Sequence, residues 1–209
     1  AKGDTATAAI RFRSVMAAPN ATPDQQDEAT YRLAELEYFA GHFNEAIRNL
    51  DAISTNLKAD YTNDALLLRS FLQENSQGAE IPLKEFARAD YLARQKKYTD
   101  AISLFQNVID KNPQALFVDD GMMRIATLQT KATRYADALA TYQALVSQFK
   151  ESSIALDKAQ FSIAELYDYN LNNKVQAIAA YEKLLADHPQ SLLNEKARRR
   201  IRELRGDSL

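Results

Sequence analysis

Small and large apolar residues recur along the chain with the spacing of an amphipathic helix. Four segments share the order Ala, apolar, two variable residues, large apolar, two variable residues, apolar. They begin at Ala46, Ala101, Ala138 and Ala177. Offsets of four and three residues place the marked positions on one helical face. The pattern predicts four helices in which the Ala lets a neighbouring helix approach and the large residue fills the space beside it.

A further helical stripe precedes each segment, as in Ile125, Ala126 and Leu128, and a short polar turn separates the two stripes. Each unit is therefore predicted to be two antiparallel helices, A and B. These residues resemble the tetratricopeptide repeat family, although the Trp at the start of helix A is missing. The Pro that ends the family's repeat occurs at Pro113 and Pro189, and Lys58 and Lys150 replace it in the other two repeats. The resemblance implies an all-α fold, a right-handed α-solenoid of antiparallel helix pairs with about eleven helices.

The spacing of the marked alanines is unequal: they lie 55, 37 and 39 residues apart. The first interval exceeds the second by the length of one helix with its turn, so we predict an extra helix over 60–75. Five apolar residues there are too many for one narrow face, which predicts contacts on two sides: Leu66, Leu67, Leu68, Phe71 and Leu72. A single added helix breaks the A–B alternation. We therefore expect a junction at about 60–80 that divides any binding groove.

Both ends of the chain fit the same array. We expect an orphan helix B of a truncated repeat (1–18), repeats at 22–57, 81–113, 115–150 and 153–189, an extra inserted helix (60–78) and a C-terminal capping helix (191–205). Thr22 and Pro23 are typical of a helix start, and Ser191 is expected to cap the last helix. A helix B without its helix A predicts that Ile10, Phe12 or Val15 is exposed or packs on another copy of the chain, which would be self-association through this helix. It also predicts a longer parent protein.

Composition excludes several classes of protein. The chain has 34 Ala and 24 Leu but only five Gly and five Pro, too few turn formers for a sandwich or barrel. Acidic and basic residues nearly cancel, 28 against 26, which argues against nucleic acid as a partner. No run approaches the roughly 18 apolar residues of a membrane span. There is no Cys, so thiolate chemistry and disulfides are excluded.

Residues that could carry chemistry are few. His42 and His188 are far apart in the sequence, and each falls in a turn between helices. The pair Asp119-Asp120 precedes an apolar helix, where negative charge is favourable. No phosphate loop, His-Glu-x-x-His run or calcium loop occurs. We therefore predict no catalytic, cofactor or metal site, and not an enzyme. The basic residues of the last helix are interpreted as a solvated face, with an acidic partner or anionic lipid as the alternative.

Surface shape is then the remaining basis for function, and we expect a protein–protein interaction scaffold. The resemblance implies a concave face, formed by the A helices, that binds a peptide or partner helix. A one-residue insertion near Asn172 shifts the positions in the fourth repeat. With that shift, the positions that line the family's groove are Tyr31, Glu35, Tyr38, Phe86, Asp90, Arg94, Met123, Thr127, Lys131, Phe161, Glu165 and Tyr169. The alternative is that the large members, Tyr31, Phe86, Met123 and Phe161, pack between repeats as core.

Two other functions stay open at this stage. The ending His188-Pro189-x-Ser191 with Ala197 and Ile201 resembles the last repeats of bacterial envelope tetratricopeptide proteins, such as those of the Tol-Pal and outer-membrane assembly systems. That resemblance implies an envelope assembly factor, anchored through upstream sequence, in the periplasm or at the outer-membrane periphery. The other function is an adaptor region of an enzyme whose catalytic domain lies upstream.

Overall fold

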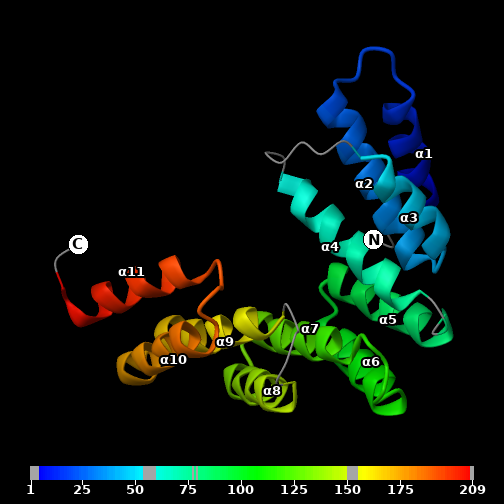
Figure 1. Ribbon diagram of the computed structural model, residues 1–209. Coiled ribbons are helices and arrows are strands. Elements are labelled where there is room, and N and C mark those ends of the chain that lie inside the picture. Colours follow the sequence, from blue (N-terminus) through cyan, green and yellow to red (C-terminus); the bar gives the residue numbers. More distant parts are fainter. Residues whose placement is uncertain (1–4, 54–59, 77, 79, 150–154, 208–209) are drawn as a thin grey trace. The chain divides into compact units, whose positions relative to one another are not determined.

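The computed structural model describes residues 5–53, 60–76, 78, 80–149 and 155–207. Within these ranges the regular structure is eleven α-helices and one π-helical segment (Figure 1). The helices are α1 (Thr5–Met16), α2 (Pro23–Phe39), α3 (Phe43–Asp51), α4 (Asp60–Asn75), α5 (Glu80–Arg94), α6 (Tyr98–Lys111), α7 (Val118–Lys131), α8 (Tyr135–Gln148), α9 (Ala155–Glu165), α10 (Lys174–Asp187) and α11 (Asn194–Arg205), and the π-helical segment is η1 (Leu166–Asn170).

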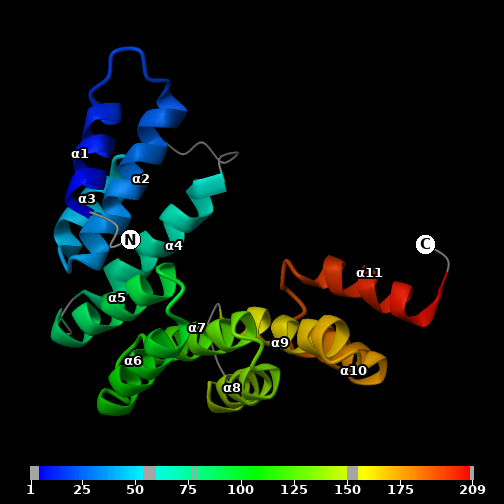
Figure 2. The ribbon, with the colours of Figure 1, turned by 180° about the vertical axis from the view of Figure 1, so that it is seen from behind.

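The chain divides into two compact units. Unit 1 holds residues 1–95 and 115–117, and unit 2 holds 96–114 and 118–209. Most helices that follow one another in the sequence pack against each other: in unit 1 from α1 to α4, and in unit 2 from α6 to α11. Helix α5 of unit 1 packs on α2 instead. Figures 1 and 2 show α3 beside α2 in unit 1 and α10 beside α9 in unit 2. This is the packing of a tetratricopeptide-like helical solenoid, as the sequence predicts.

The turn between helix A and helix B has the same backbone in all four places. A residue with positive φ lies five positions before each buried Ala of helix B, at Gly41, Lys96, Thr133 and Asn172. The turn after α7 shows why. There the Thr133 amide donates to the Thr130 carbonyl at 3.0 Å, and the Arg134 amide donates to the Gln129 carbonyl at 2.8 Å. These two bonds pair carbonyl groups of the last helical turn that have no partner within the helix. The chain can form them because Thr133, at the end of the helix, adopts a left-handed backbone conformation.

The last helix pair contains one residue more than the others. Ala164 and Ala177 are 13 positions apart, whereas Ala126 and Ala138 are 12 apart. The extra residue is taken up by η1, where the Leu171 amide donates to the Leu166 carbonyl. A single inserted residue widens one helical turn into a π-turn. The sequence predicts an insertion near Asn172, whereas in the structure the extra residue lies within the helical segment Leu166–Asn170.

An aromatic side chain of α4 packs against both α2 and α5 in unit 1. The Phe71 ring lies 6.4 Å from that of Tyr38 on α2 and 5.2 Å from that of Phe86 on α5. Helices α2 and α5 also bond directly, because the Tyr38 hydroxyl donates to Asp90 at 2.6 Å. The division between compact units falls after Gln95 and not within 60–80. The change of direction expected at 60–80, and the divided groove that would follow from it, stay a prediction. Phe71 packs with aromatic rings of α2 and α5, which holds this segment inside unit 1.

Only some of the apolar side chains of α4 are buried. Phe71 and Leu72 are buried, but Leu66 and Leu67 are 43% and 52% exposed, and Leu68 is half-buried. The expectation of contacts on two sides is therefore wrong for Leu66 and Leu67. Buried positions of α4 follow a helical period of three to four residues, so only one stripe faces the core.

The C-terminal helix starts later than the sequence suggests. Helix α11 begins at Asn194, and its N-cap residue is Leu193. Ser191 is therefore not the cap: its hydroxyl donates to Asp157 at 2.5 Å and accepts from the Leu193 amide at 3.1 Å. The hydroxyl is used to fix the loop to α9. Gly206 ends the helix with a φ of 81°, as expected.

The N-terminal helix is exposed, as expected. Helix α1 packs against α2, but none of its residues is buried, and Ile10 is 62% exposed. Helix α2 begins as the sequence indicates. Thr22 accepts from the Gln25 amide, the Gln25 side chain accepts from the Thr22 amide, and Pro23 is the first helical residue.

Candidate protein-binding surface

The large candidate residues of unit 1 lie in its core. Tyr31 is 5% exposed and stacks on Tyr61 with ring centroids 6.2 Å apart. Tyr38 is 3% exposed, and Phe86 is fully buried between the rings of Phe71 and Phe117. Burial also raises the pKa of the Tyr31 hydroxyl. For Tyr31 and Phe86 the structure thus agrees with the core alternative.

The charged candidate residues of unit 1 bond to one another across α2 and α5. Glu35 accepts from Arg32 at 2.8 Å, and an Arg94 nitrogen lies 3.8 Å from the same carboxylate. Asp90 accepts the Tyr38 hydroxyl. These groups hold α2 against α5. Of the unit 1 candidates, Arg94 has the most solvent-exposed side chain.

In unit 2, three candidate residues lie along α7. Met123 and Thr127 are half-buried, and Lys131 is exposed at the last turn. The Thr127 hydroxyl donates to the Met123 carbonyl at 2.8 Å and lies 3.2 Å from the Tyr142 hydroxyl on α8. Within the described residues Lys131 forms no ion pair. This end of α7 therefore presents a methionine, a hydroxyl and a free positive charge.

The neighbouring helix carries the other three. Phe161 is half-buried, with its ring 5.5 Å from that of Tyr181. Burial raises the pKa of Glu165, and the positive charge of Lys196 opposes that rise. Tyr169, in η1, is 57% exposed, and the Arg200 guanidinium lies 4.8 Å from its ring centroid. Helices α7 and α9 are in contact, so both sets lie on adjoining A helices.

Sequence reasoning missed the group that holds Tyr169 in place. Asp168 is buried in η1, and Arg200 of α11 grips its carboxylate through Nε at 2.6 Å and through a terminal nitrogen at 2.8 Å. The Tyr181 hydroxyl donates to Asp168 at 3.4 Å. We call Glu165, Asp168, Tyr169, Tyr181, Lys196 and Arg200 the α9–α11 polar cluster.

This cluster corrects the interpretation of α11. Arg200 does not belong to a wholly solvated basic face, because it neutralises a buried carboxylate, and Arg205 pairs with Glu182. The one-residue insertion was the available signal. Inserted residues in helices produce π-turns, and π-turns are frequent at functional sites.

Comparison with protein families decides the identity of the array. The sequence model of the tetratricopeptide repeat family matches residues 85–115, 120–152 and 158–191. The chain is a tetratricopeptide repeat protein. The matched segments hold α5 with α6, α7 with α8, and α9 with α10. A search among curated proteins gave no match.

A tetratricopeptide repeat protein acts in general as a scaffold for protein–protein interaction, and this is the function of the chain at that level. Among the helices that the structure describes, none is long and apolar enough to cross a membrane. The same part of the chain holds no group of three or more His, Cys, Asp or Glu side chains suited to a metal ion.

Proposed function

We propose that this scaffold binds a peptide or partner helix on the A-helix surface of unit 2. The surface consists of Met123, Thr127 and Lys131 of α7 together with Phe161, Glu165 and Tyr169 of α9 and η1. The observation that carries the proposal is the exposure of Tyr169, a large aromatic side chain fixed by Arg200. Tyrosine and arginine are enriched among residues that dominate binding energy, because they combine apolar area with a polar group.

The charges suggest the chemistry of the ligand. Lys131 and Lys196 are exposed, whereas Glu165 is half-buried. An acidic group on the ligand would meet these two ammonium groups, and an apolar side chain would meet Tyr169 and the partly covered Met123 and Phe161. We therefore infer a ligand segment that combines an apolar anchor with a carboxylate.

Selection of peptides from a random displayed library, followed by binding measurements with the whole chain, tests this proposal. Tyr169→Ala and Lys131→Glu should each weaken the selected peptides about tenfold or more, since each removes a central contact. Val175→Ala is the matched control, because Val175 is 75% exposed but lies in helix B rather than on the A-helix surface. Equal affinities for all three variants would contradict the proposal.

Self-association is a second candidate, favoured by the exposure of α1. Phe12 and Val15 of α1 and Ala29 and Arg32 of α2 line an open groove of about 580 Å³ in unit 1. We propose that a second copy of the chain covers it. Sedimentation velocity should show a concentration-dependent dimer that Val15→Glu abolishes. A monomer at every concentration would refute this.

The envelope and enzyme-adaptor alternatives make the same use of the A-helix surface and differ in cellular setting. A signal or lipid-attachment sequence upstream in the parent gene would favour an envelope assembly factor. A catalytic domain there would favour the adaptor. Sequencing the parent gene distinguishes them.

A further inference from the structure

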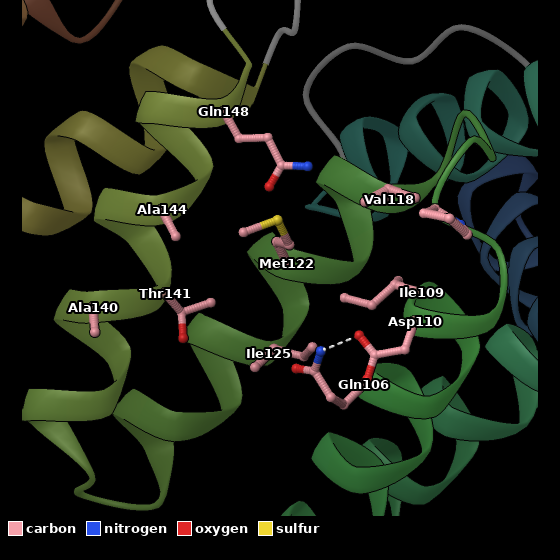
Figure 3. Close-up of a pocket in the computed structure, with 11 residues that line it drawn as sticks. Gln106, Ile109, Asp110, Val118, Met122, Ile125, Ala140, Thr141, Ala144 and Gln148 are labelled. Atoms are coloured by element: carbon pink, nitrogen blue, oxygen red, sulfur yellow. Dashed lines mark hydrogen bonds between the residues drawn. The ribbon is translucent and has the colours of Figure 1, made fainter.

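A groove of about 510 Å³ runs along α7 between α6 and α8 in unit 2. Figure 3 shows Met122 of α7 between Ile109 of α6 and Ala144 of α8. Met122 and Met123 are consecutive, so their side chains leave the helix about 100° apart. The groove therefore lies on a different side of α7 from the A-helix surface proposed above, and it is lined by residues that the candidate set did not include.

The corresponding position in the next helix pair is used differently. Met122 lies four residues before Ala126, and Gln160 lies four residues before Ala164. Gln160 is 2% exposed, and its amide donates to the Ala180 carbonyl of α10 at 3.0 Å. That hydrogen bond connects α9 to α10. At the corresponding position of α7, Met122 has an apolar, half-buried side chain. The two helix pairs therefore differ at this position, with a buried hydrogen bond in α9–α10 and an apolar side chain at the groove in α7–α8.

The shape of the groove suits an approaching helix. Ala140 and Ala144 lie one turn apart on α8, and both are solvent-exposed. Small residues at this spacing let a second helix come close, because no side chain separates the backbones. The volume lies within the range of natural binding pockets, roughly 300–1,000 Å³. Several aliphatic side chains can therefore enter between α6 and α8.

The charge of the groove selects the partner. Asp110 is the single charged side chain among the residues that line it, and the other polar ones are neutral amides and a hydroxyl. Gln106 donates to one Asp110 oxygen at 2.8 Å. Within the described residues Asp110 forms no ion pair. A ligand with a positive charge near its apolar side chains fits this rim, and a negatively charged ligand is repelled.

We propose that this groove binds an amphipathic helix of a partner protein, which inserts aliphatic side chains beside Met122 and places a Lys or Arg against Asp110. Helix-in-groove recognition uses apolar anchors at positions i, i+3 or i+4 and i+7. The partner helix therefore carries such a stripe with basic residues at its edge. This site is independent of the A-helix surface.

The chain contains three methionines, and each reports on a separate surface: Met16 on α1, Met122 in the groove and Met123 on the A-helix surface. Methionine-methyl NMR of the whole chain can therefore locate a ligand. The probes are two designed helical peptides of about 18 residues. Both have the same leucine stripe, flanked by Lys in one and by Glu in the other. The Lys peptide is expected to shift the Met122 methyl signal and leave Met16 unchanged.

Variants on α8 and α6 complete the test. Ala140→Trp should fill the groove and weaken the Lys peptide about tenfold or more. The matched control is Ala179→Trp: Ala179 is also exposed and follows Ala177 as Ala140 follows Ala138. Asp110→Lys should reverse the preference in favour of the Glu peptide. The proposal is overturned if neither peptide shifts Met122, if both tryptophan variants bind alike, or if the Lys peptide shifts Met123 alone. A Met123 shift caused by library-selected peptides tests the A-helix surface separately.

Discussion

Replacing Thr133 by Gly is expected to stabilise the α7–α8 pair. Thr133 has a φ of 59°, in the left-handed region that β-branched residues rarely adopt. The first repeat has Gly41 at the corresponding position, with a φ of 79°. The fourth repeat has Asn172 there, and Asn tolerates this conformation better than other residues with a Cβ atom. The four turns therefore form a natural series with one geometry and different backbone strain.

The size of the effect follows from two opposing contributions. A left-handed backbone costs a residue other than Gly about 1–2 kcal/mol. Glycine loses about 0.5–1 kcal/mol more conformational entropy on folding than Ala. The bond from the Thr133 hydroxyl to the Ala132 carbonyl is exposed and contributes little. The Thr133→Gly variant should thus gain about 0.5–1 kcal/mol, whereas Asn172→Gly should change the free energy of unfolding by less than about 0.5 kcal/mol.

Hydrogen exchange is the suitable assay, because repeat arrays do not always unfold in one step. Slowed exchange is expected at the amides of α7 and α8 in Thr133→Gly, together with a higher urea midpoint by circular dichroism. Gly41→Ala serves as the converse, since its new Cβ would also lie 2.8 Å from the Lys84 side chain. Two results would contradict this prediction: amides of α7 and α8 that exchange as fast in Thr133→Gly as in the wild type, or an equal gain in the free energy of unfolding in Asn172→Gly.

Three further results are expected. Arg200→Ala should lower the free energy of unfolding by roughly 3 kcal/mol, since it leaves the Asp168 carboxylate buried without its partner, and adding Asp168→Asn should restore much of the loss, measured by urea titration. The pKa of Glu165 is raised in the folded state, so folding is favoured when this carboxyl is protonated. That contribution to stability is fully present below the ordinary pKa of 4.5 and is lost as pH rises through the higher pKa of the folded state. Glu165→Gln should therefore have a higher melting temperature than the wild type at pH 7, and this difference should disappear at pH 4. Leu72→Ala should cost about 2–5 kcal/mol because Leu72 is fully buried, and Leu67→Ala on the same helix should cost under about 0.5 kcal/mol; equal unfolding midpoints would contradict the assignment of the buried stripe.

The helices could be predicted from the sequence because their signals are local. The period of apolar residues and the cap at Thr22 depend on residues a few positions apart. The extra helix over 60–75 followed from spacing alone. Which of its leucines face the core could not be predicted, because Leu66 and Leu67 have the same chemistry as Leu72 and differ only in what lies opposite.

The candidate site was less predictable for a similar reason. Position within the repeat indicates which face a residue occupies, but burial depends on distant partners. Phe86 is enclosed by Phe71 of α4 and by Phe117, which lies in the turn before α7. Asp168 and Arg200 lie in different helices, and neither stands out by sequence alone. Their pairing depends on η1, and a one-residue insertion can equally be placed in a loop.

The π-turn also limits how freely the repeats can be exchanged. Tetratricopeptide repeats are treated as modules whose order can be altered, since each contacts only its neighbours. The repeat at 158–191 carries Asp168, and α11 carries the arginine that Asp168 requires. A chimera with the 120–152 repeat in the last place would present Arg200 to a helix without that carboxylate. The last repeat and α11 therefore form one inseparable building block, and any shortened or shuffled version of this protein should keep residues 158–205 together.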